Sequence, residues 1–267
     1  MLAKKFELFD LNVHFTVDGS FKDYRRNIPA TISNYMLNVP KEIEVCGALE
    51  VGIPSIGNYS HVEFMNLNGF TNSRKFSGVT YDTVKNPGKE CQKLKVLGYL
   101  GLKYHPRSFQ DNFFSRASKS LIRACGDLDL IYGICTYESD CLYSSRFNYE
   151  LRETIDCAIL NNLKIILFHG GGQNFDEFYS IYGKQCNVFF DCSFSLLRFK
   201  RKDFLAKVIE VLNNGAENIG FGSDYPDYCI KDYQDTLNDI IENVNLKNFK
   251  KFISDNSLSF IGGAGAK

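Results

Sequence analysis

The sequence predicts an α/β protein with the (β/α)8 barrel architecture, and three observations lead to that prediction. Short apolar runs of strand length recur eight times along the chain. Segments with apolar residues at a spacing of three to four, typical of amphipathic helices, separate most of these runs. The chain has 267 residues, enough for eight strand-helix units. An open, doubly wound sheet is the alternative arrangement of the same elements.

The predicted strands are rich in β-branched and aromatic residues and end in turn residues or polar side chains. In order they span 8–15, 44–53, 76–81, 98–105, 129–137, 164–169, 187–194 and 218–224. Helical periodicity is clear in 115–126, 149–163, 175–184, 201–213 and 232–244, and weaker in 31–39, 57–68 and 87–95. No repeat or proline-rich linker interrupts the chain, so we expect one barrel domain over residues 1–267.

The composition narrows the function classes. Lys plus Arg and Asp plus Glu both number 31, so no basic excess attracts nucleic acid or anionic lipid. No apolar run approaches the length of a membrane-spanning helix, and the first residues lack a secretory pattern, so we expect a cytoplasmic protein. Nine cysteines are scattered without a C-x-x-C pair, which predicts free thiols in a reducing compartment.

Polar residues cluster at the predicted carboxyl ends of the strands, which converge on one face of a barrel. Strict alternation would put three of them, at the end of the first strand, on one side of that strand. The set comprises Asp10, Asn12 and His14 on the first strand, Lys103 and His105 on the fourth, Cys135 and Tyr137 on the fifth, His169 on the sixth and Asp224 on the eighth. Three of the four histidines belong to this set, so we predict a functional site at this face.

Two of these strand ends have informative surroundings. His169 precedes three glycines and a helix start, a pattern that lets backbone N–H groups approach an anion. An HGGG run also forms the oxyanion loop of serine hydrolases, but the sequence lacks the G-x-S-x-G motif that those enzymes need. Asp224, in GSDYP, suits a metal ligand, a general base for water, or both. Purely structural roles in turns remain the alternative for both residues.

The fourth strand end carries positive charge. Lys103 is predicted to point inward together with His105, and Arg107 follows after one proline. These side chains suit a carboxylate or phosphate group of a substrate. A solvated loop with a hydrogen-bonded histidine is the alternative.

Six short motifs carry a family resemblance: FDLNVHF, LGLKYHP, LFHGGG, NVFFDCS, FGSDYP and DNSLSFIG. Together and in this order they resemble the amidohydrolase superfamily, most of all its branch of hydrolases, lactonases and decarboxylases related to aminocarboxymuconate semialdehyde decarboxylase. The resemblance runs from residue 8 to about residue 262. It implies a TIM barrel with a divalent metal, usually zinc, a small-molecule substrate and, in many relatives, a homodimer.

The resemblance assigns several residues to family motifs. Asp10 and His14 match D-x-H-x-H, His169 matches H-x-G-G, Asp224 matches G-S-D-x-P, and Lys103, His105 and Pro106 match K-x-H-P. Asn12, however, replaces the first histidine of the H-x-H pair, and Cys135 replaces the histidine of strand five. Asparagine is a poor zinc ligand, whereas a thiolate is a good one. The implied metal ligands are therefore His14 and Asp224, with Cys135 as a third and Asn12 as a weak one, so the metal site is reduced or absent.

The first functional hypothesis is a hydrolase acting on the carbonyl of a small, anionic lactone, amide or related compound. Asp224 would be the general base, His169 would stabilise the oxyanion, and Lys103, His105 or Arg107 would bind the anionic group. A decarboxylase of the same branch is an alternative. A second hypothesis, motivated by Asn12 and Cys135, is a catalytically silent barrel that serves as a binding or regulatory protein. Phosphoester chemistry is a third, resting on the glycine run and the nearby cations.

Overall fold

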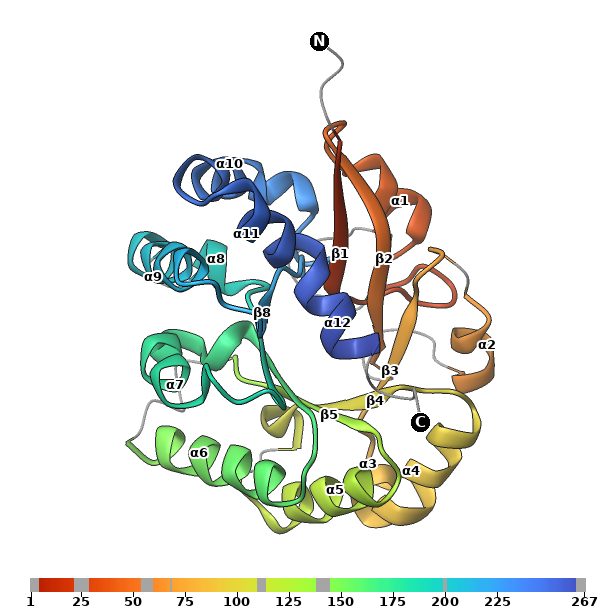
Figure 1. Cartoon of the computed structure of the whole chain (residues 1–267). Coiled ribbons are helices and arrows are strands. Elements are labelled where there is room, and N and C mark those ends of the chain that lie inside the picture. Colours follow the sequence, from red (N-terminus) through yellow and green to blue (C-terminus); the bar gives the residue numbers. More distant parts are fainter. Residues whose placement is uncertain are drawn as a thin grey trace.

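The computed structural model describes residues 5–21, 29–53, 60–67, 69–109, 114–137, 145–198 and 201–262. Eight parallel strands form one sheet in chain order, with helices around its outside (Figure 1). The strands are β1 (Phe6–Val13), β2 (Ile43–Gly52), β3 (Arg74–Gly78), β4 (Gly101–Tyr104), β5 (Ile131–Cys135), β6 (Ile165–Phe168), β7 (Val188–Asp191) and β8 (Ile219–Gly220). All eight predicted strands are confirmed.

The first and last strands meet, so the sheet closes into a barrel. The Leu11 N–H donates to the Phe221 carbonyl at 3.1 Å, and the Asp224 N–H donates to the Asn12 carbonyl at 2.8 Å. The His14 N–H donates to the Tyr225 carbonyl at 2.7 Å. These bonds confirm the (β/α)8 prediction and rule out the open sheet.

The helices agree with the sequence pattern where they are long. They are α1 (Ile32–Leu37), α2 (His61–Met65), α3 (Tyr81–Lys85), α4 (Pro87–Val96), α5 (Arg116–Asp127), α6 (Ser145–Leu160), α7 (Phe175–Tyr182), α8 (Ser195–Arg198), α9 (Arg201–Asn213), α10 (Gln234–Asn243), α11 (Leu246–Lys250) and α12 (Asn256–Gly262). Helices α3, α8, α11 and α12 were not predicted. Each has at most seven residues, about two turns, which is too short to show a 3.6-residue period.

Apolar side chains fill the barrel from the end where the strands begin. The interior cluster comprises Phe9, Leu11, Leu49, Val51, Phe76, Ile131, Ile166, Phe168 and Phe189, together with Phe260 and Ile261 of α12. The Lys164 ammonium, just before β6, donates to the Phe260 carbonyl at 2.6 Å. Helix α12, blue in Figure 1, therefore covers this end of the interior. The opposite end, at the carboxyl ends of the strands, is left for polar side chains.

Strand β1 does not alternate regularly. Its ladder with β2 shifts register between Leu8 and Phe9 and again between Asp10 and Val13. Asp10 consequently turns toward α1, where the Tyr35 hydroxyl donates to its Oδ2 at 2.9 Å. The prediction that Asp10 shares one side of the strand with Asn12 and His14 is therefore wrong for Asp10. A bulge changes which face each following side chain occupies, and alternation counting does not detect it.

The cysteines of the described residues are free thiols, as predicted. Eight of the nine lie within the described residues and none forms a disulfide there, whereas Cys141 lies outside them. Across the described part of the chain, no helix has the length and apolarity that a membrane crossing requires.

A buried ion pair joins β2 and β3. The Lys75 ammonium lies 2.5 Å from Glu50 Oε2, and the Glu50 side chain is fully buried. We predict that Lys75→Met destabilises the fold by about 3–5 kcal/mol, because it leaves a buried carboxylate without its cation. Urea unfolding followed by circular dichroism measures the loss.

The matched control is Lys93→Met, which removes the exposed ion pair of Lys93 with Glu90, at 3.7 Å. We expect it to cost less than about 1 kcal/mol. If both variants lost the same free energy of unfolding, the buried ion pair would be no more stabilising than the exposed one.

Candidate active site

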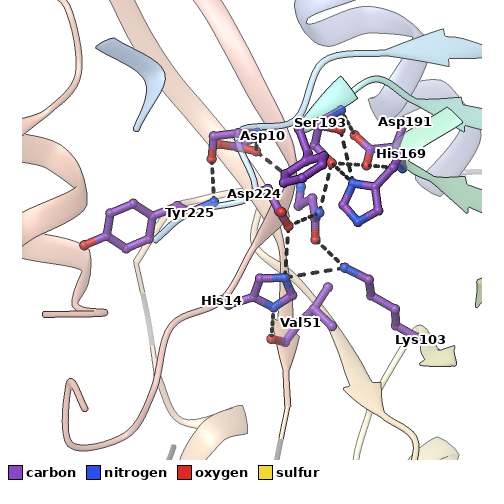
Figure 2. Close-up of polar contacts among 12 residues, drawn as sticks. Asp10, His14, Val51, Lys103, His169, Asp191, Ser193, Asp224 and Tyr225 are labelled. Carbon is purple, nitrogen blue, oxygen red and sulfur yellow. Dashed lines mark hydrogen bonds and ion pairs between the residues drawn. The ribbon is translucent and has the colours of Figure 1, made fainter. Parts of the chain in front are cut away.

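Polar side chains from six strands meet at this end of the barrel. Five of these strands were predicted to contribute to the site, and the sixth, β7, was not. Figure 2 shows this arrangement around Asp224. The contributors are Asn12 and His14 from β1, Lys103 from β4, Cys135 from β5, His169 after β6, Asp191 and Ser193 from the end of β7, and Asp224 after β8. All are buried in the described structure.

Asp224 lies at the centre of the site. Its backbone has a positive φ of 62°, so the chain leaves the extended conformation of β8 here and directs the carboxylate inward. Oδ1 accepts a hydrogen bond from the Asn12 amide nitrogen at 2.6 Å and lies 3.3 Å from His14 Nε2. Burial alone would raise the pKa of Asp224, but the charge on His169, the hydrogen bond to His14 and the Lys103 ammonium outweigh it and lower the pKa. Asp224 is therefore a carboxylate at neutral pH.

Lys103 brings a cation into the same cluster. Its ammonium donates to Asn12 Oδ1 at 3.0 Å and lies 3.4 Å from His14 Nε2. It also lies 4.2 Å from the ring centroid of Phe168, at the top of the apolar interior. Burial lowers the pKa of Lys103, while the negative charges of Asp224, Cys135 and Asp191 oppose that shift. The side chain is only 1% exposed, so these contacts replace its hydration.

His14 is oriented by the neighbouring strand. Its Nδ1 lies 2.9 Å from the carbonyl oxygen of Val51, which only accepts, so Nδ1 carries a hydrogen. Burial and the Lys103 ammonium lower the pKa of His14, although Asp224 opposes them. Nε2 lies between the Asp224 carboxylate, at 3.3 Å from Oδ1, and the Lys103 ammonium, at 3.4 Å.

His169 is held by the end of β7. Its Nδ1 lies 3.1 Å from the Ser193 carbonyl and 3.3 Å from Ser193 Oγ, and the Ser193 hydroxyl in turn donates to Asp191 Oδ2. The Asn12 amide nitrogen donates to the same Ser193 Oγ at 2.9 Å, which links the two halves of the site. Burial alone would lower the pKa of His169, but the negative charges of Asp224 and Cys135 raise it overall.

Cys135 is buried at the end of β5, and its thiol and His169 act electrostatically on each other. Burial alone would raise the pKa of the thiol. The charges on His169, Arg107 and Lys103 and the hydrogen bond to His169 outweigh that effect and lower the pKa of Cys135 to about 6. The thiol and the imidazole therefore favour the thiolate and imidazolium forms.

The glycines after His169 form the predicted turn between strand and helix. Gly170, Gly171 and Gly172 all have positive φ values, from 64° to 89°. The Gly171 N–H donates to Thr136 Oγ1 at 2.9 Å, and the Thr136 hydroxyl donates to the Phe168 carbonyl at 2.6 Å. The run thus fixes the chain direction just after His169. An anion-binding role for its N–H groups stays a prediction.

The remaining predicted residues lie toward the rim of the site. His105 is half-buried, and burial together with the nearby charges of Lys103 and Arg107 lowers its pKa well below the usual value. Arg107 is exposed, and its guanidinium lies 4.5 Å from the ring centroid of Tyr137. The Tyr137 ring packs edge-on against His169, at 6.4 Å between centroids. Arg107 therefore lies near His169, with Tyr137 between them, but remains exposed to solvent.

The residues present do not fit the expected metal. No group of three or more His, Cys, Asp and Glu side chains able to hold a metal exists within the described ranges, so the expected shell of His14, Asp224, Cys135 and Asn12 is not assembled. Asn12 turns its nitrogen toward Asp224 and its oxygen toward Lys103. A divalent ion at His14 Nε2 and Asp224 Oδ1 would also face the Lys103 ammonium, which already lies beside that nitrogen.

Sequence reasoning missed two residues of the site, Asp191 and Ser193. Both belong to the DCS motif at the end of a predicted strand, which is the same feature that identified the others. Asp191 Oδ1 also accepts from the Ser193 N–H at 3.0 Å. Asp10, in contrast, is not in the site: its Oδ1 accepts from the Ser223 and Asn12 N–H groups at 2.8 and 3.2 Å and ties β1 to the chain after β8.

Several solved structures are similar in fold to this chain. No protein-family model and no curated protein matches the chain. Among solved structures, an uncharacterised TIM-barrel protein from Bordetella bronchiseptica has a TM-score of 0.75 and 15% identity, over 97% of this chain and 99% of that one. A proposed 2-pyrone-4,6-dicarboxylic acid hydrolase from Pseudomonas putida has a TM-score of 0.68 and 14% identity, over 96% and 97%. A 2,6-dihydroxybenzoate decarboxylase from Rhizobium has a TM-score of 0.61 and 13% identity, over 98% and 100%.

At these identities the likeness shows the fold. The chain has the TIM-barrel fold, which these hydrolases and decarboxylases also have.

The Asp10 carboxyl makes the stability of the fold depend on pH. Burial raises the pKa of Asp10 to about 6, although hydrogen bonds from Ser223 and Tyr35 oppose the shift. The folded state thus binds this proton more tightly than the unfolded state does. The resulting stability is fully present below about pH 4, the unfolded pKa, and is lost as the pH rises through 6.

We predict that Asp10→Asn, which keeps an oxygen for both N–H groups, abolishes this dependence. The unfolding free energy of the wild type relative to the variant should fall by about 2.4 kcal/mol between pH 4 and pH 7. Urea titrations of both proteins at four pH values measure it. A constant difference would mean that Asp10 has an ordinary pKa in the folded protein.

Proposed function

We propose that the protein hydrolyses the carbonyl of a small anionic compound, a lactone, an amide or a related ester, with Asp224 as general base. The observation that carries the proposal is the buried Asp224 carboxylate at the carboxyl ends of the strands, kept ionised among Lys103, His14 and His169. A carboxylate in that position accepts a proton from an attacking water. The fold shared with hydrolases supports the assignment.

Lys103 supplies the positive charge that hydrolysis of a carbonyl requires. Negative charge grows on the carbonyl oxygen during attack, and a fixed cation in a buried site stabilises it strongly. The Lys103 ammonium is held by Asn12 Oδ1 at 3.0 Å, and His169 lies near enough for its charge to act on the same Asp224 carboxylate. Because the side chains present do not fit a divalent ion, no step here passes through a metal.

The substrate class follows from the rim of the site. Arg107 is exposed and stacked on Tyr137, and a guanidinium in this setting binds carboxylates with two parallel hydrogen bonds. His105 lies between Lys103 and Arg107 in the chain and extends the polar surface. A cyclic ester that bears carboxylates is the first candidate, in line with the proposed 2-pyrone-4,6-dicarboxylic acid hydrolase of the same fold.

Decarboxylation is the second candidate. The same constellation of a cation and a base suits loss of carbon dioxide from a hydroxylated aromatic acid, and a 2,6-dihydroxybenzoate decarboxylase shares the fold. Release of carbon dioxide from such acids, measured beside hydrolysis of lactones and amides, distinguishes the two.

We predict that Asp224→Asn lowers kcat for the best lactone or amide by a factor of about 10² to 10⁴, because the amide no longer accepts the proton. Lys103→Met should lower kcat by about 10² or more through loss of oxyanion stabilisation. Steady-state kinetics on a panel of lactones and amides, each with and without a carboxylate, gives both values.

Asp235→Asn, in the exposed first turn of α10, is the matched control and should leave kcat unchanged. Undiminished hydrolysis by a folded Asp224→Asn variant would remove Asp224 from the mechanism.

A separate experiment tests whether the site binds zinc. We predict that the wild type takes up less than about a tenth of an equivalent of zinc, because an ammonium lies beside the nitrogen that would bind the ion. The triple variant Asn12→His/Cys135→His/Lys103→Ala supplies two imidazoles and removes that cation, and it should bind about one equivalent. Elemental analysis after gel filtration measures both.

Stoichiometric zinc in the wild type would contradict the assignment of Lys103. Uptake by the variant alone, with a wild type that turns over no compound of the panel, would favour the silent binding protein over the hydrolase.

A further inference from the structure

The two chain segments that hold His169 and Asp224 meet at a third side chain. The chain after β7 holds the His169 ring, and the chain after β8 carries Asp224. Tyr233, which immediately precedes α10, bonds to both segments. Its hydroxyl accepts a hydrogen bond from the Phe194 N–H at 2.9 Å and donates one to the Ser223 carbonyl at 2.8 Å. One phenol group therefore joins the two sides of the site.

The Tyr233 hydroxyl acts as acceptor and donor at once. A backbone N–H only donates and a carbonyl only accepts, so the directions of both bonds are fixed. The side chain is fully buried, which shields both bonds from bulk water. The Phe221 ring packs edge-on against the Tyr233 ring at 5.1 Å between centroids, and the Tyr228 ring lies at 6.2 Å. The packing of the core thus fixes where the hydroxyl lies.

The bond to Phe194 controls the peptide unit that holds His169. The Phe194 N–H and the Ser193 carbonyl belong to one planar peptide unit and point in opposite directions. Tyr233 binds the N–H end, and the carbonyl oxygen at the other end lies 3.1 Å from His169 Nδ1. Rotation of this peptide plane would break both contacts together. The hydroxyl therefore acts on the imidazole through a single rigid unit.

The same peptide unit leads into a strained residue. Phe194 has a positive φ of 64°, which is uncommon for a residue other than glycine. Such a conformation costs free energy and persists only where the surrounding structure holds it. The Phe194 ring lies 5.5 Å from the His169 ring and 4.7 Å from the Tyr137 ring, measured between centroids. The bond from its N–H to Tyr233 is one of the contacts that maintain this arrangement.

The bond to Ser223 acts on Asp224 in the same way. The Ser223 carbonyl and the Asp224 N–H share one peptide unit. Tyr233 donates to the carbonyl at 2.8 Å, and the N–H donates to the Asn12 carbonyl, also at 2.8 Å. Asp224 has a positive φ of 62°, so the direction of its carboxylate depends on how this unit is held.

We propose that Tyr233 is a positioning residue of the site: its hydroxyl holds two peptide units in a fixed relative orientation and so sets the placement of the His169 ring relative to the Asp224 carboxylate. Because the side chain is fully buried and bonded to backbone groups, it acts through these residues and not on a substrate. The placement follows from the contacts above, whereas its effect on rate rests on the proposed hydrolysis.

The first test is kinetic and uses Tyr233→Phe, which keeps the ring and removes only the hydroxyl. On the best substrate of the panel, kcat should fall at least about tenfold while KM stays within about threefold, because misplaced catalytic groups are felt most in the transition state. The matched control is Tyr132→Phe on β5. Tyr132 is also fully buried, and its hydroxyl bonds to Ser118 Oγ of α5 at 2.9 Å. This control should lose stability comparably and keep its kcat.

The second test needs no substrate. In protein labelled with ¹⁵N-histidine, NMR follows the ring nitrogens, and His169→Asn identifies the signals of His169. The Ser193 carbonyl only accepts, so the hydrogen on His169 Nδ1 faces it. Tyr233→Phe should speed the exchange of this hydrogen with water at least about tenfold, because its acceptor is no longer fixed. The ring signals of His61, on α2, should stay unchanged in both tyrosine variants.

The outcomes keep the two proposals apart. A folded Tyr233→Phe variant with kcat within about threefold of the wild type, or with a loss no greater than that of Tyr132→Phe, overturns the positioning role. Unchanged exchange at His169 Nδ1 overturns it as well. Absence of hydrolysis across the panel removes the proposed function, and the exchange measurement then judges Tyr233 alone.

A Tyr233→Phe variant that does not fold leaves the wild type as the test. The Phe194 N–H should exchange at least about 10³-fold more slowly than in the unfolded chain, because it is bonded to a buried hydroxyl. Exchange at the rate of the unfolded chain would show that the hydroxyl does not hold this peptide unit, and would overturn the proposal.

Discussion

The side-chain amide of Asn12 is the contact on which the site depends. Its nitrogen donates to the Asp224 carboxylate at 2.6 Å and its oxygen accepts from the Lys103 ammonium at 3.0 Å, so one neutral group separates a buried anion from a buried cation. The same nitrogen donates to Ser193 Oγ and so reaches the His169 side of the barrel. Its backbone carbonyl accepts from the Asp224 N–H, which also makes Asn12 part of the closure between β1 and β8.

Charge balance explains how so many ionisable groups are buried together. Removing a single charge from water costs several kcal/mol, and partners of opposite sign offset that cost only when they are close and hydrogen-bonded. Here Lys103 and His169 face Asp224, Asp191 and Cys135. The pKa shifts of His169, Asp224 and Cys135 run in the directions that favour their charged forms, whereas burial lowers the pKa of Lys103 and raises that of Asp191. The apolar interior cluster, which includes Phe168 beneath the Lys103 ammonium, fills the other end of the barrel.

The fold class and most of the site residues could be predicted from the sequence, because they depend on local patterns. The strands are apolar runs, and residues such as Lys103, His169 and Asp224 stand out as polar endings of those runs. What was missed depends on contacts between distant segments. The bulge that turns Asp10 toward Tyr35 arises from the pairing of β1 with β2 and leaves no mark in the alternation. Asn12 was predicted to be a weak metal ligand, because nothing local shows that Lys103, 91 positions away, reaches its oxygen. Cys135 was assigned to the same shell because it stands where the family resemblance places the histidine of strand five.

The central claim is that a lysine ammonium, held by Asn12, stands beside His14 and Asp224 where the family resemblance implies a zinc ion. Crystals grown in the presence of zinc, with anomalous diffraction recorded at the zinc absorption edge, test it most directly. The account predicts no anomalous peak at the site and density for the Lys103 ammonium within hydrogen-bond distance of Asn12 Oδ1. An anomalous peak at coordination distance from His14 Nε2 and Asp224, with Lys103 displaced from Asn12, would contradict it.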